Sequence, residues 1–236
     1  MKLVVGNQKS YLNSNEINHF IEGLTNISNP NVIICPSSIY FDRFKNTNIM
    51  LGSQNVSSYP SGATTGELSA EQLKSLGVQF ALVGHSERRQ VMGESIKDTN
   101  IKIKRLLDNR IVPILCVGET KEERDNDKTK EIILDEIIGA FEGFSTDFVE
   151  KIIIAYEPIW SIGTGNIPNN DEIEEVAKYL RDVIRDRYNT SNIILYGGSV
   201  NKDNIDYLNK INMIDGYLIG GASTKIDGFL DIINKC

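Results

Sequence analysis

The sequence predicts an α/β protein of 236 residues whose residues 1–236 form one (β/α)8 barrel domain. Eight short runs rich in Val, Ile and Leu recur along the chain, and amphipathic, helix-like segments separate most of them. Such short, continuous runs are typical of strands buried on both faces. Strand then helix, repeated about eight times at this length, matches a (β/α)8 barrel. A doubly wound open sheet is the alternative, and it is weaker because the strands continue without a domain break.

The apolar runs and the segments between them define the expected elements in chain order. The expected strands are 2–7, 31–38, 49–55, 80–86, 112–119, 151–158, 192–199 and 216–223. Expected helices include 69–77, 95–110, 128–144, 170–188 and 201–212. Ser69 is the expected N-cap of the first of these helices, and Asn170-Asp171 the start of another. Neither a charge block nor a low-complexity segment divides the chain.

The composition is typical of a soluble globular protein with a large single core. Hydrophobic residues make up 40% of the chain and charged residues 24%. The net charge of -7 argues against nucleic acid as a partner, although a local cationic pocket for a small anion remains compatible with it. The apolar runs are too short to span a bilayer, and the N-terminus lacks the features of a signal peptide. We therefore expect a cytoplasmic protein without a membrane partner.

The cysteines and histidines make a metal centre or a disulfide framework improbable. Cys35, Cys116 and Cys236 are an odd number and widely spaced, unlike the cysteines of disulfide frameworks or zinc sites. His19 and His85 are the chain's two histidines, too few for a histidine-rich metal site. The chain also lacks a dinucleotide-binding fingerprint. We expect neither a metal ion nor a cofactor.

Polar residues and glycines collect at the C-terminal ends of the expected strands. In a (β/α)8 barrel those ends form one face of the molecule, and active sites are built there. Residues far apart in the sequence are therefore expected to converge. They are Asn7, Lys9, Gln54, Asn55, His85, Glu119, Glu157, Ser199, Gly220 and Gly221.

Glu157 is the first candidate for chemistry, in the stretch KIIIAYEPIWSIGTGN. A single carboxylate at the end of a buried strand is either a structural residue in an ion pair or a functional one. Pro158 restricts Glu157 to extended backbone angles, and Gly163-Thr164-Gly165 can absorb large dihedral changes. A mobile lid beside a carboxylate suits a base that must be sheltered from water.

His85 ends the fourth expected strand, and Ser86-Glu87-Arg88-Arg89 is an expected helix start. A lone histidine is more often structural than catalytic. Here, backbone amides at a helix N-terminus disfavour a nearby positive charge. We therefore expect a lowered imidazole pKa and a neutral ring that donates a hydrogen bond to a substrate oxygen.

Lys9 and two glycine pairs complete the candidate site. Lys9 is either a surface lysine or a positive charge facing the mouth of the barrel. The glycines of YGGSV (196–200) and LIGGAS (218–223) are either turn residues or sources of backbone amides for a phosphate group. Barrels of this class often bind phosphate there. Together these residues favour proton transfer next to a carbonyl on a small phosphorylated substrate.

Eight motifs, in chain order, resemble the triosephosphate isomerase family: GNQK, SQNVS, GATTGELSA, VGHSERR, CVGET, AYEPIWSIGTG, YGGSV and IGGAS. The resemblance covers essentially the whole chain. It implies a TIM barrel that interconverts D-glyceraldehyde 3-phosphate and dihydroxyacetone phosphate without a cofactor, a reaction of glycolysis and gluconeogenesis. One alternative is a non-catalytic phosphate-binding barrel or interaction protein derived from the enzyme, which should lose Glu157 or His85 first. Another is a barrel isomerase or lyase for larger phosphorylated substrates, which should lack GHSERR combined with AYEPIW.

The resemblance also implies a role for each candidate residue. Glu157 would be the base, His85 the electrophile at the carbonyl, and Lys9 the cation beside the dianion. Glu87 would support the polar network of the site, and residues 158–168 would form the lid. Cys116 would pack behind the site without a chemical role. The implied substrate-binding residues are Asn7, Lys9, Gly163, Ser199, Gly220 and Gly221.

A homodimer is implied too, with Thr65 in the loop 62–67 reaching Asn7 and Lys9 of the partner subunit. Three residues near this contact, Gln8, Ser10 and Tyr11, depart from the common family motif, which bears on dimer strength. The lid ends in Asn166-Ile167-Pro168 rather than the usual sequence. Because proline restricts φ, we expect altered lid kinetics with activity retained.

Overall fold

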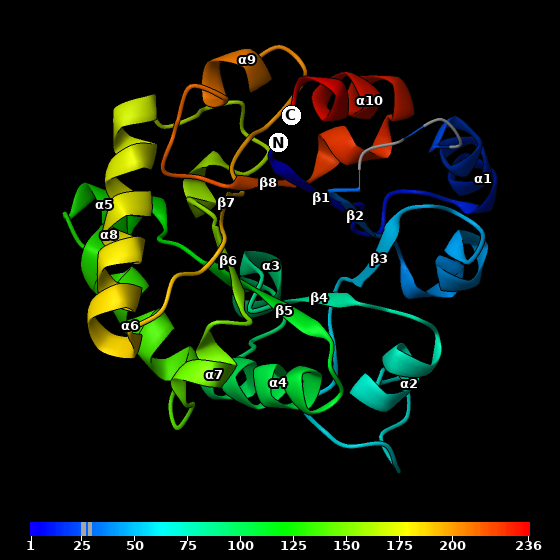
Figure 1. The fold of residues 1–236 in the computed structure, drawn as a ribbon, viewed down its shortest axis with the longest axis horizontal. Helices are drawn as coiled ribbons and strands as arrows, with labels where there is room; N and C mark the ends of the chain where they lie inside the picture. Colours follow the sequence, from blue (N-terminus) through cyan, green and yellow to red (C-terminus); the bar gives the residue numbers. More distant parts are fainter. Residues whose placement is uncertain (25–26, 28–29) are drawn as a thin grey trace.

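A computed structural model describes residues 1–24, 27 and 30–236, which form a closed barrel of eight parallel strands surrounded by helices (Figure 1). The strands pair in chain order, and β1 pairs with β8 to close the barrel. The predicted (β/α)8 architecture is therefore confirmed. The strands are β1 Leu3–Asn7, β2 Val32–Cys35, β3 Met50–Ser53, β4 Phe80–Val83, β5 Val112–Val117, β6 Ile153–Tyr156, β7 Ile194–Tyr196 and β8 Gly216–Ile219.

All eight expected strands are present, but most stop short of the predicted C-terminal ends. The run predicted at 192–199, for example, pairs only over Ile194–Tyr196. The polar residues and glycines that follow such strands leave the ladder and form the loops at the mouth of the barrel. The site is therefore built on loop residues held at fixed positions by short, buried strands.

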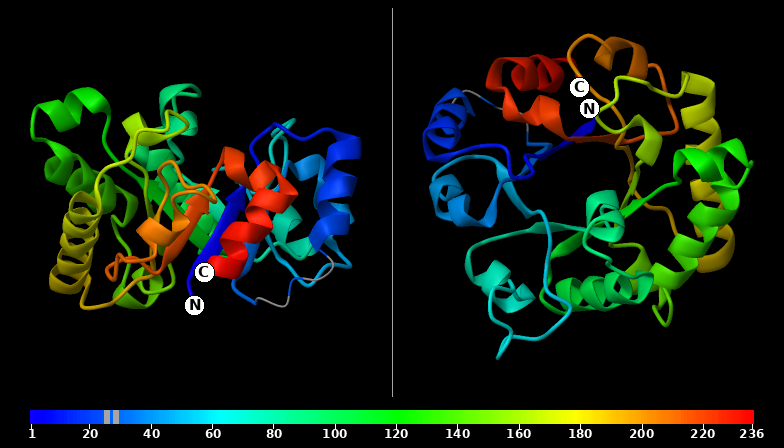
Figure 2. Two further views of the ribbon diagram at one scale, coloured as in Figure 1. Left: turned by 90° about the horizontal axis from the view of Figure 1, so that it is seen from above. Right: turned by 180° about the vertical axis from the view of Figure 1, so that it is seen from behind.

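Helices and short 3₁₀-helices follow the strands and cover the outside of the barrel (Figure 2). The helices are α1 Ser14–Gly23, α2 Ala70–Ser75, α3 Ser86–Gln90, α4 Ile96–Asp108, α5 Lys121–Asp125, α6 Thr129–Ala140, α7 Thr146–Val149, α8 Asn170–Tyr188, α9 Ile205–Leu208 and α10 Ile226–Lys235. The 3₁₀-helices are η2 Ser38–Phe44, η3 Ile159–Ser161 and η4 Gly221–Thr224.

Local side-chain chemistry explains where these helices begin and end. Ser69 caps α2 as predicted, accepting the backbone N–H of Gln72. Helix α8 begins at Asn170 as predicted, and Asn169 caps it by accepting the backbone N–H of Glu172. The helix predicted at 201–212 shrinks to Ile205–Leu208, because the side chains of Asn201 and Asn204 accept backbone N–H groups of this segment.

Alternating side chains divide the strand residues between two apolar cores. Val5 points into the barrel while its neighbour Val4 packs under the helices, as the two-residue period of a strand requires. Because side chains fill the barrel interior, the functional site lies at its end. The interior core consists of Val5, Ile33, Cys35, Leu82, Ile114, Cys116, Ile153, Ala155, Leu195 and Leu218.

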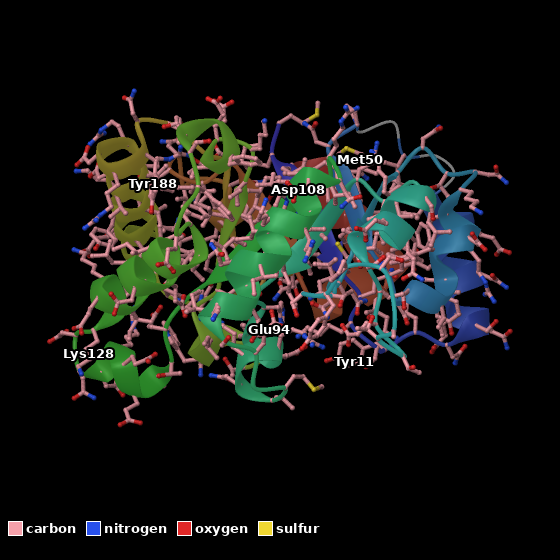
Figure 3. The ribbon with its side chains drawn as sticks, turned by 90° about the horizontal axis from the view of Figure 1, so that it is seen from below. Tyr11, Met50, Glu94, Asp108, Lys128 and Tyr188 are labelled. Carbon is pink, nitrogen blue, oxygen red and sulfur yellow. The ribbon has the colours of Figure 1, made fainter. Side chains whose placement is uncertain are left out.

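The two ends of the barrel carry different groups of residues (Figure 3). Tyr11 and Glu94, which follow β1 and β4, lie on one side of the molecule, and Met50 and Asp108 lie on the other. The side that holds Tyr11 is the end toward which the parallel strands run. All candidate site residues follow strands on this side, so the fold brings them to one face.

Candidate active site

A cleft of about 390 Å³ opens at the C-terminal ends of the strands, between the barrel mouth and the segment after β6. All the residues predicted for catalysis or substrate binding line it. Glu87 and Thr65 lie outside it. The predicted lining residues are Asn7, Lys9, His85, Glu157, Gly163, Ser199, Gly220 and Gly221.

Glu157 and His85 form a buried pair at the bottom of this cleft. The Nε2 atom of His85 lies 3.2 Å from Oε1 of Glu157, and both side chains are almost fully buried. The backbone N–H of Ser86 donates to Oε2 of Glu157 over 3.4 Å. The carboxylate and the imidazole therefore serve as each other's partner at the cleft.

The start of α3 fixes the orientation of the imidazole. His85 is the N-cap of this helix, and its Nδ1 accepts the backbone N–H of Glu87 over 3.2 Å. An acceptor nitrogen carries no proton, so in this arrangement the ring proton lies on Nε2, toward the cleft. This tautomer places a hydrogen-bond donor where a substrate oxygen can approach.

The pKa of His85 differs from the prediction. Burial lowers the pKa of the imidazole, but the charge and hydrogen bond of Glu157 raise it more, so the net shift is upward from the usual 6.5. For Glu157, burial raises the pKa, but His85 and the Ser86 amide lower it below the usual 4.5. The expectation of a lowered His85 pKa was wrong for the substrate-free protein, because it left out the facing carboxylate.

Lys9 is held at the mouth in an unusual backbone conformation. Its φ of 49° lies in the left-handed region, which costs a residue with a side chain on the order of 1–3 kcal/mol. Its N–H donates to Oδ1 of Asn7, and its carbonyl accepts from Nε2 of Gln54. Its ammonium group lies 2.5 Å from Oε1 of Glu87. Residues at the ends of β1 and β3 and at the start of α3 therefore hold the Lys9 ammonium group beside the cleft.

Comparison with known proteins identifies the family. A family model described as triosephosphate isomerase matches residues 2–236. The chain belongs to the triosephosphate isomerase family. The triosephosphate isomerase of Dictyoglomus thermophilum is 40% identical over 99% of each chain. That of Alkaliphilus metalliredigens is 43% identical over 86% of this chain and 85% of its own. The predicted family, isomerase class and function are thereby confirmed.

The triosephosphate isomerase cleft depends on two glycines in a way that the sequence analysis missed. A Cβ atom on Gly197 would lie 2.8 Å from Cγ of Glu157. One on Gly198 would lie 2.8 Å from Oγ of Ser161 and still closer to the Tyr196 hydroxyl. These glycines of YGGSV therefore make room for the candidate base and for the segment that follows it, in addition to exposing backbone amides.

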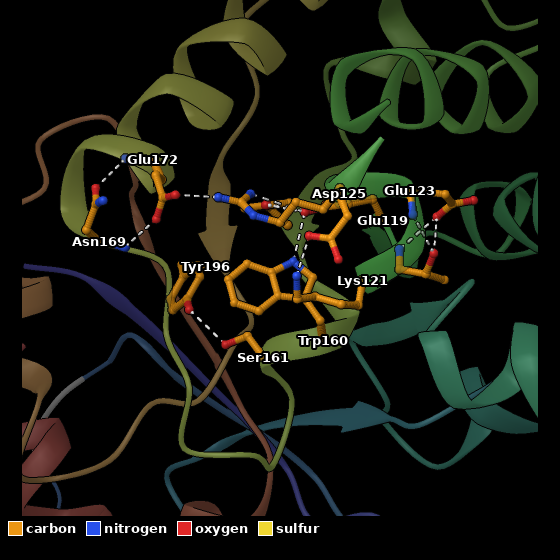
Figure 4. A network of polar contacts seen from close by, with 12 residues as sticks. Glu119, Lys121, Glu123, Asp125, Trp160, Ser161, Asn169, Glu172 and Tyr196 are labelled. Atoms are coloured by element: carbon orange, nitrogen blue, oxygen red, sulfur yellow. Dashed lines mark hydrogen bonds and ion pairs between the residues drawn. The ribbon is translucent and has the colours of Figure 1, made fainter. Parts of the chain in front are cut away.

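A second polar network anchors the beginning of the lid (Figure 4). The fully buried Glu119, after β5, accepts hydrogen bonds at Oε1 from Nε1 of Trp160 over 3.0 Å and from the Tyr156 hydroxyl over 3.2 Å. The Arg124 guanidinium lies over the Trp160 ring, 4.7 Å from its centroid, and pairs with Glu172 of α8. This network joins Trp160, at the beginning of the lid segment, to the ends of β5 and β6 and, through Arg124, to α8.

Three residues that depart from the family motif take different places. Gln8 is buried, with its Nε2 donating to the Ser223 carbonyl over 3.4 Å. Ser10 and Tyr11 are exposed at the mouth. The expected effect of these three residues on dimer strength stays a prediction.

Of the cysteines, Cys116 lies next to the candidate base. Cys116 is buried behind Glu157, and burial raises the pKa of its thiol well above the usual value.

Among the described residues, no group of three or more His, Cys, Asp or Glu could hold a metal ion. Within that same part of the chain, no helix is long and apolar enough to cross a membrane.

Proposed function

We propose that Glu157, His85 and Lys9 carry out the isomerisation of D-glyceraldehyde 3-phosphate and dihydroxyacetone phosphate in this cleft. The observation that carries these assignments is the buried contact of 3.2 Å between Glu157 and His85, in the same cleft as Lys9. A base, a hydrogen-bond donor and a cation are what proton transfer next to a carbonyl requires.

Glu157 acts as the base. Its lowered pKa keeps the carboxylate ionised at neutral pH. It takes a proton from the carbon next to the substrate carbonyl, which leaves an enediolate, and returns the proton to the neighbouring carbon. The hydroxyl proton passes between the two substrate oxygens, and Nε2 of His85 donates to one oxygen and accepts from the other. Because the proton moves within one substrate molecule, the reaction needs neither an oxidant nor a cofactor.

His85 stabilises the negative charge that develops on oxygen. The substrate carbonyl oxygen replaces Glu157 as the acceptor of the Nε2 proton. Separation of the two side chains removes the main cause of the raised His85 pKa. Burial and the amide bond at Nδ1 then favour the neutral imidazole.

The phosphate group binds at the glycines and the serine that line the cleft. Gly163, Ser199, Gly220 and Gly221 offer backbone N–H groups there. Lys9 lies close to Gly220: a Cβ atom added to Gly220 would lie 3.4 Å from Cε of Lys9. Lys9 and Asn7 thus lie close to the proposed phosphate site, and Glu87 holds the Lys9 ammonium group.

Replacement of the base tests these assignments. We expect Glu157→Gln to lower turnover of D-glyceraldehyde 3-phosphate about 10²- to 10⁴-fold, because an amide cannot accept the proton. Glu142→Gln removes a carboxylate from an exposed loop residue and should retain wild-type turnover. Near-normal turnover in Glu157→Gln would reject Glu157 as the base. Absence of turnover in folded wild-type protein would favour the non-catalytic barrel.

A homodimer completes the proposal. Beside the main cleft lies a second pocket of about 310 Å³, whose lining includes Lys9, Gln54, His85 and Met92. The exposed loop 62–67, between β3 and α2, reaches outward from the ring of helices (Figure 1) and carries the exposed Thr65. We propose that this loop of one subunit enters the second pocket of the other.

We further propose a single domain, a cytoplasmic location and a small anionic substrate. The closed barrel supports treating residues 1–236 as one domain. Cys35 and Cys116 are unpaired buried thiols, in keeping with a reducing compartment and a cytoplasmic location. The net charge of -7 and the small cleft favour a small anionic substrate over nucleic acid.

A further inference from the structure

Ser161 is a fully buried hydroxyl residue at the end of η3, where the lid segment begins. Its Oγ atom lies 3.4 Å from the hydroxyl of Tyr196 and 3.4 Å from the backbone nitrogen of Ser199. Figure 4 shows the contact between Ser161 and Tyr196. Buried hydroxyls require such partners, and here Tyr196 ends β7 and Ser199 lies in the segment after it.

The contacts with the lid segment involve both the backbone N–H and the hydroxyl of Ser199. The Ser199 N–H donates to Oγ of Ser161, and the Ser199 hydroxyl donates to the Ser161 carbonyl over 2.6 Å. The same hydroxyl accepts the N–H of Gly165 over 3.4 Å. Ser199 also lines the cleft. In the substrate-free protein, the lid therefore uses the donors that a phosphate group would need.

We propose that Ser161 is a positioning residue whose hydroxyl competes with the substrate phosphate for the backbone N–H of Ser199. The proposal rests on the proposed function, in which Ser199 contacts the phosphate. A phosphate oxygen is a charged acceptor and forms a stronger hydrogen bond than a neutral hydroxyl. Phosphate binding therefore takes the N–H away from Ser161, which couples occupancy of the phosphate site to release of the lid.

The surroundings of Ser161 favour this specific contact. A side chain at position 198 would crowd both Oγ of Ser161 and the Tyr196 hydroxyl, so Gly198 keeps the contact open. When Oγ accepts the Ser199 N–H, its own proton is free for Tyr196. The hydroxyl is thus satisfied without phosphate, and Tyr196 remains its partner when phosphate binds.

Ser161→Ala tests the competition, because it removes the hydroxyl acceptor and keeps the backbone contacts. Inorganic phosphate is titrated into the protein, and binding is followed by the fluorescence of Trp160, the only tryptophan. We expect the Kd for phosphate to fall about three- to tenfold, the usual weight of one hydrogen bond. The KM for D-glyceraldehyde 3-phosphate should fall by a similar factor, and kcat should change by a smaller one.

Two control variants separate competition from a general packing effect. Ser53→Ala removes an equally buried hydroxyl, which bonds the Asn55 carbonyl away from the lid, and should keep the wild-type Kd. Tyr196→Phe removes the other partner of Ser161 but leaves Oγ free to accept from Ser199. It should change the Kd less than Ser161→Ala does.

The outcomes distinguish the inference from the proposed function. If wild-type protein binds phosphate in competition with substrate and folded Ser161→Ala shows an equal or higher Kd, the role of Ser161 is overturned. If wild-type protein does not bind phosphate in this cleft, both the phosphate site and the role of Ser161 are overturned. Should Ser161→Ala fold poorly, Ser161→Cys, which keeps the volume and weakens the acceptor, should still lower the Kd.

Discussion

At the scale of single residues, the charge state of His85 depends on what faces it. Two influences favour the neutral ring: burial, and the Glu87 amide that donates to Nδ1. Glu157 opposes them from 3.2 Å and raises the pKa in the substrate-free protein. In the proposed mechanism a substrate oxygen replaces that carboxylate, so the imidazole would lose the charge that raises its pKa.

Titration of His85 by NMR measures this balance directly. In the wild type we expect an imidazole pKa above 6.5, because Glu157 stabilises the charged ring. In Glu157→Gln we expect a pKa below 6.5, because burial then dominates. His19→Gln assigns the signals, since the chain has only two histidines. A wild-type pKa below 6.5 would show that the amide at Nδ1 outweighs the carboxylate.

At the scale of elements, Glu119 joins β5, β6 and the lid. One carboxylate oxygen accepts from both Trp160 and Tyr156, while Oε2 has no hydrogen-bond partner among the described residues. The network thus holds Trp160, at the beginning of the lid segment, against the ends of β5 and β6. The predicted effect of Pro168 on lid kinetics stays a prediction.

Replacement of Glu119 should destabilise the fold in two graded steps. Glu119→Ala leaves two buried donors unpaired and should lower the free energy of unfolding by about 3 kcal/mol. Glu119→Gln keeps an acceptor oxygen and should cost about 1 kcal/mol. Urea unfolding at one fixed protein concentration, followed by Trp160 emission, measures both, since dimer stability depends on concentration. If both variants lost the same free energy of unfolding, the hydrogen bonds from Tyr156 and Trp160 to Glu119 would contribute little.

At the scale of the whole molecule, the mouth of the barrel has two neighbouring pockets that share Asn7, Lys9 and His85. The proposed dimer fills the second pocket with the partner's loop and leaves the first for substrate. The partner's loop in the second pocket would then hold Asn7, Lys9 and His85 in place, and these residues also line the first pocket. Exposed apolar side chains at Tyr59, Val91 and Met92 suit burial in such an interface.

Thr65→Arg should separate the subunits. The new guanidinium would approach Lys9 of the partner subunit, and like charges repel in a partly buried contact. Light scattering should give the monomer mass of 26.4 kDa for this variant and about twice this mass for the wild type. Turnover should fall with the mass, because Lys9 and His85 lose support. Ser75→Arg adds the same charge at an exposed residue of α2 and should stay dimeric; a dimeric Thr65→Arg would contradict the proposed loop contact.

The sequence by itself determined the barrel, the family and the face on which the site lies. Buried strands of a parallel barrel require uninterrupted apolar runs, and the polar residues after them mark one end of the sheet. These signals are local, so each expected strand is present. The sequence also predicted the start of a helix where a capping residue precedes it, as Ser69 does for α2.

Only the tertiary structure decided the contacts between residues far apart in the chain. The pKa of His85 depends on Glu157, the burial of Gln8 depends on its contact with Ser223, and the need for glycine at 197 depends on Glu157. Closure of the barrel brings these residues together. A local sequence pattern does not indicate which side chains face each other in the folded protein. The electrostatics of the site, unlike its location, therefore follow from the fold.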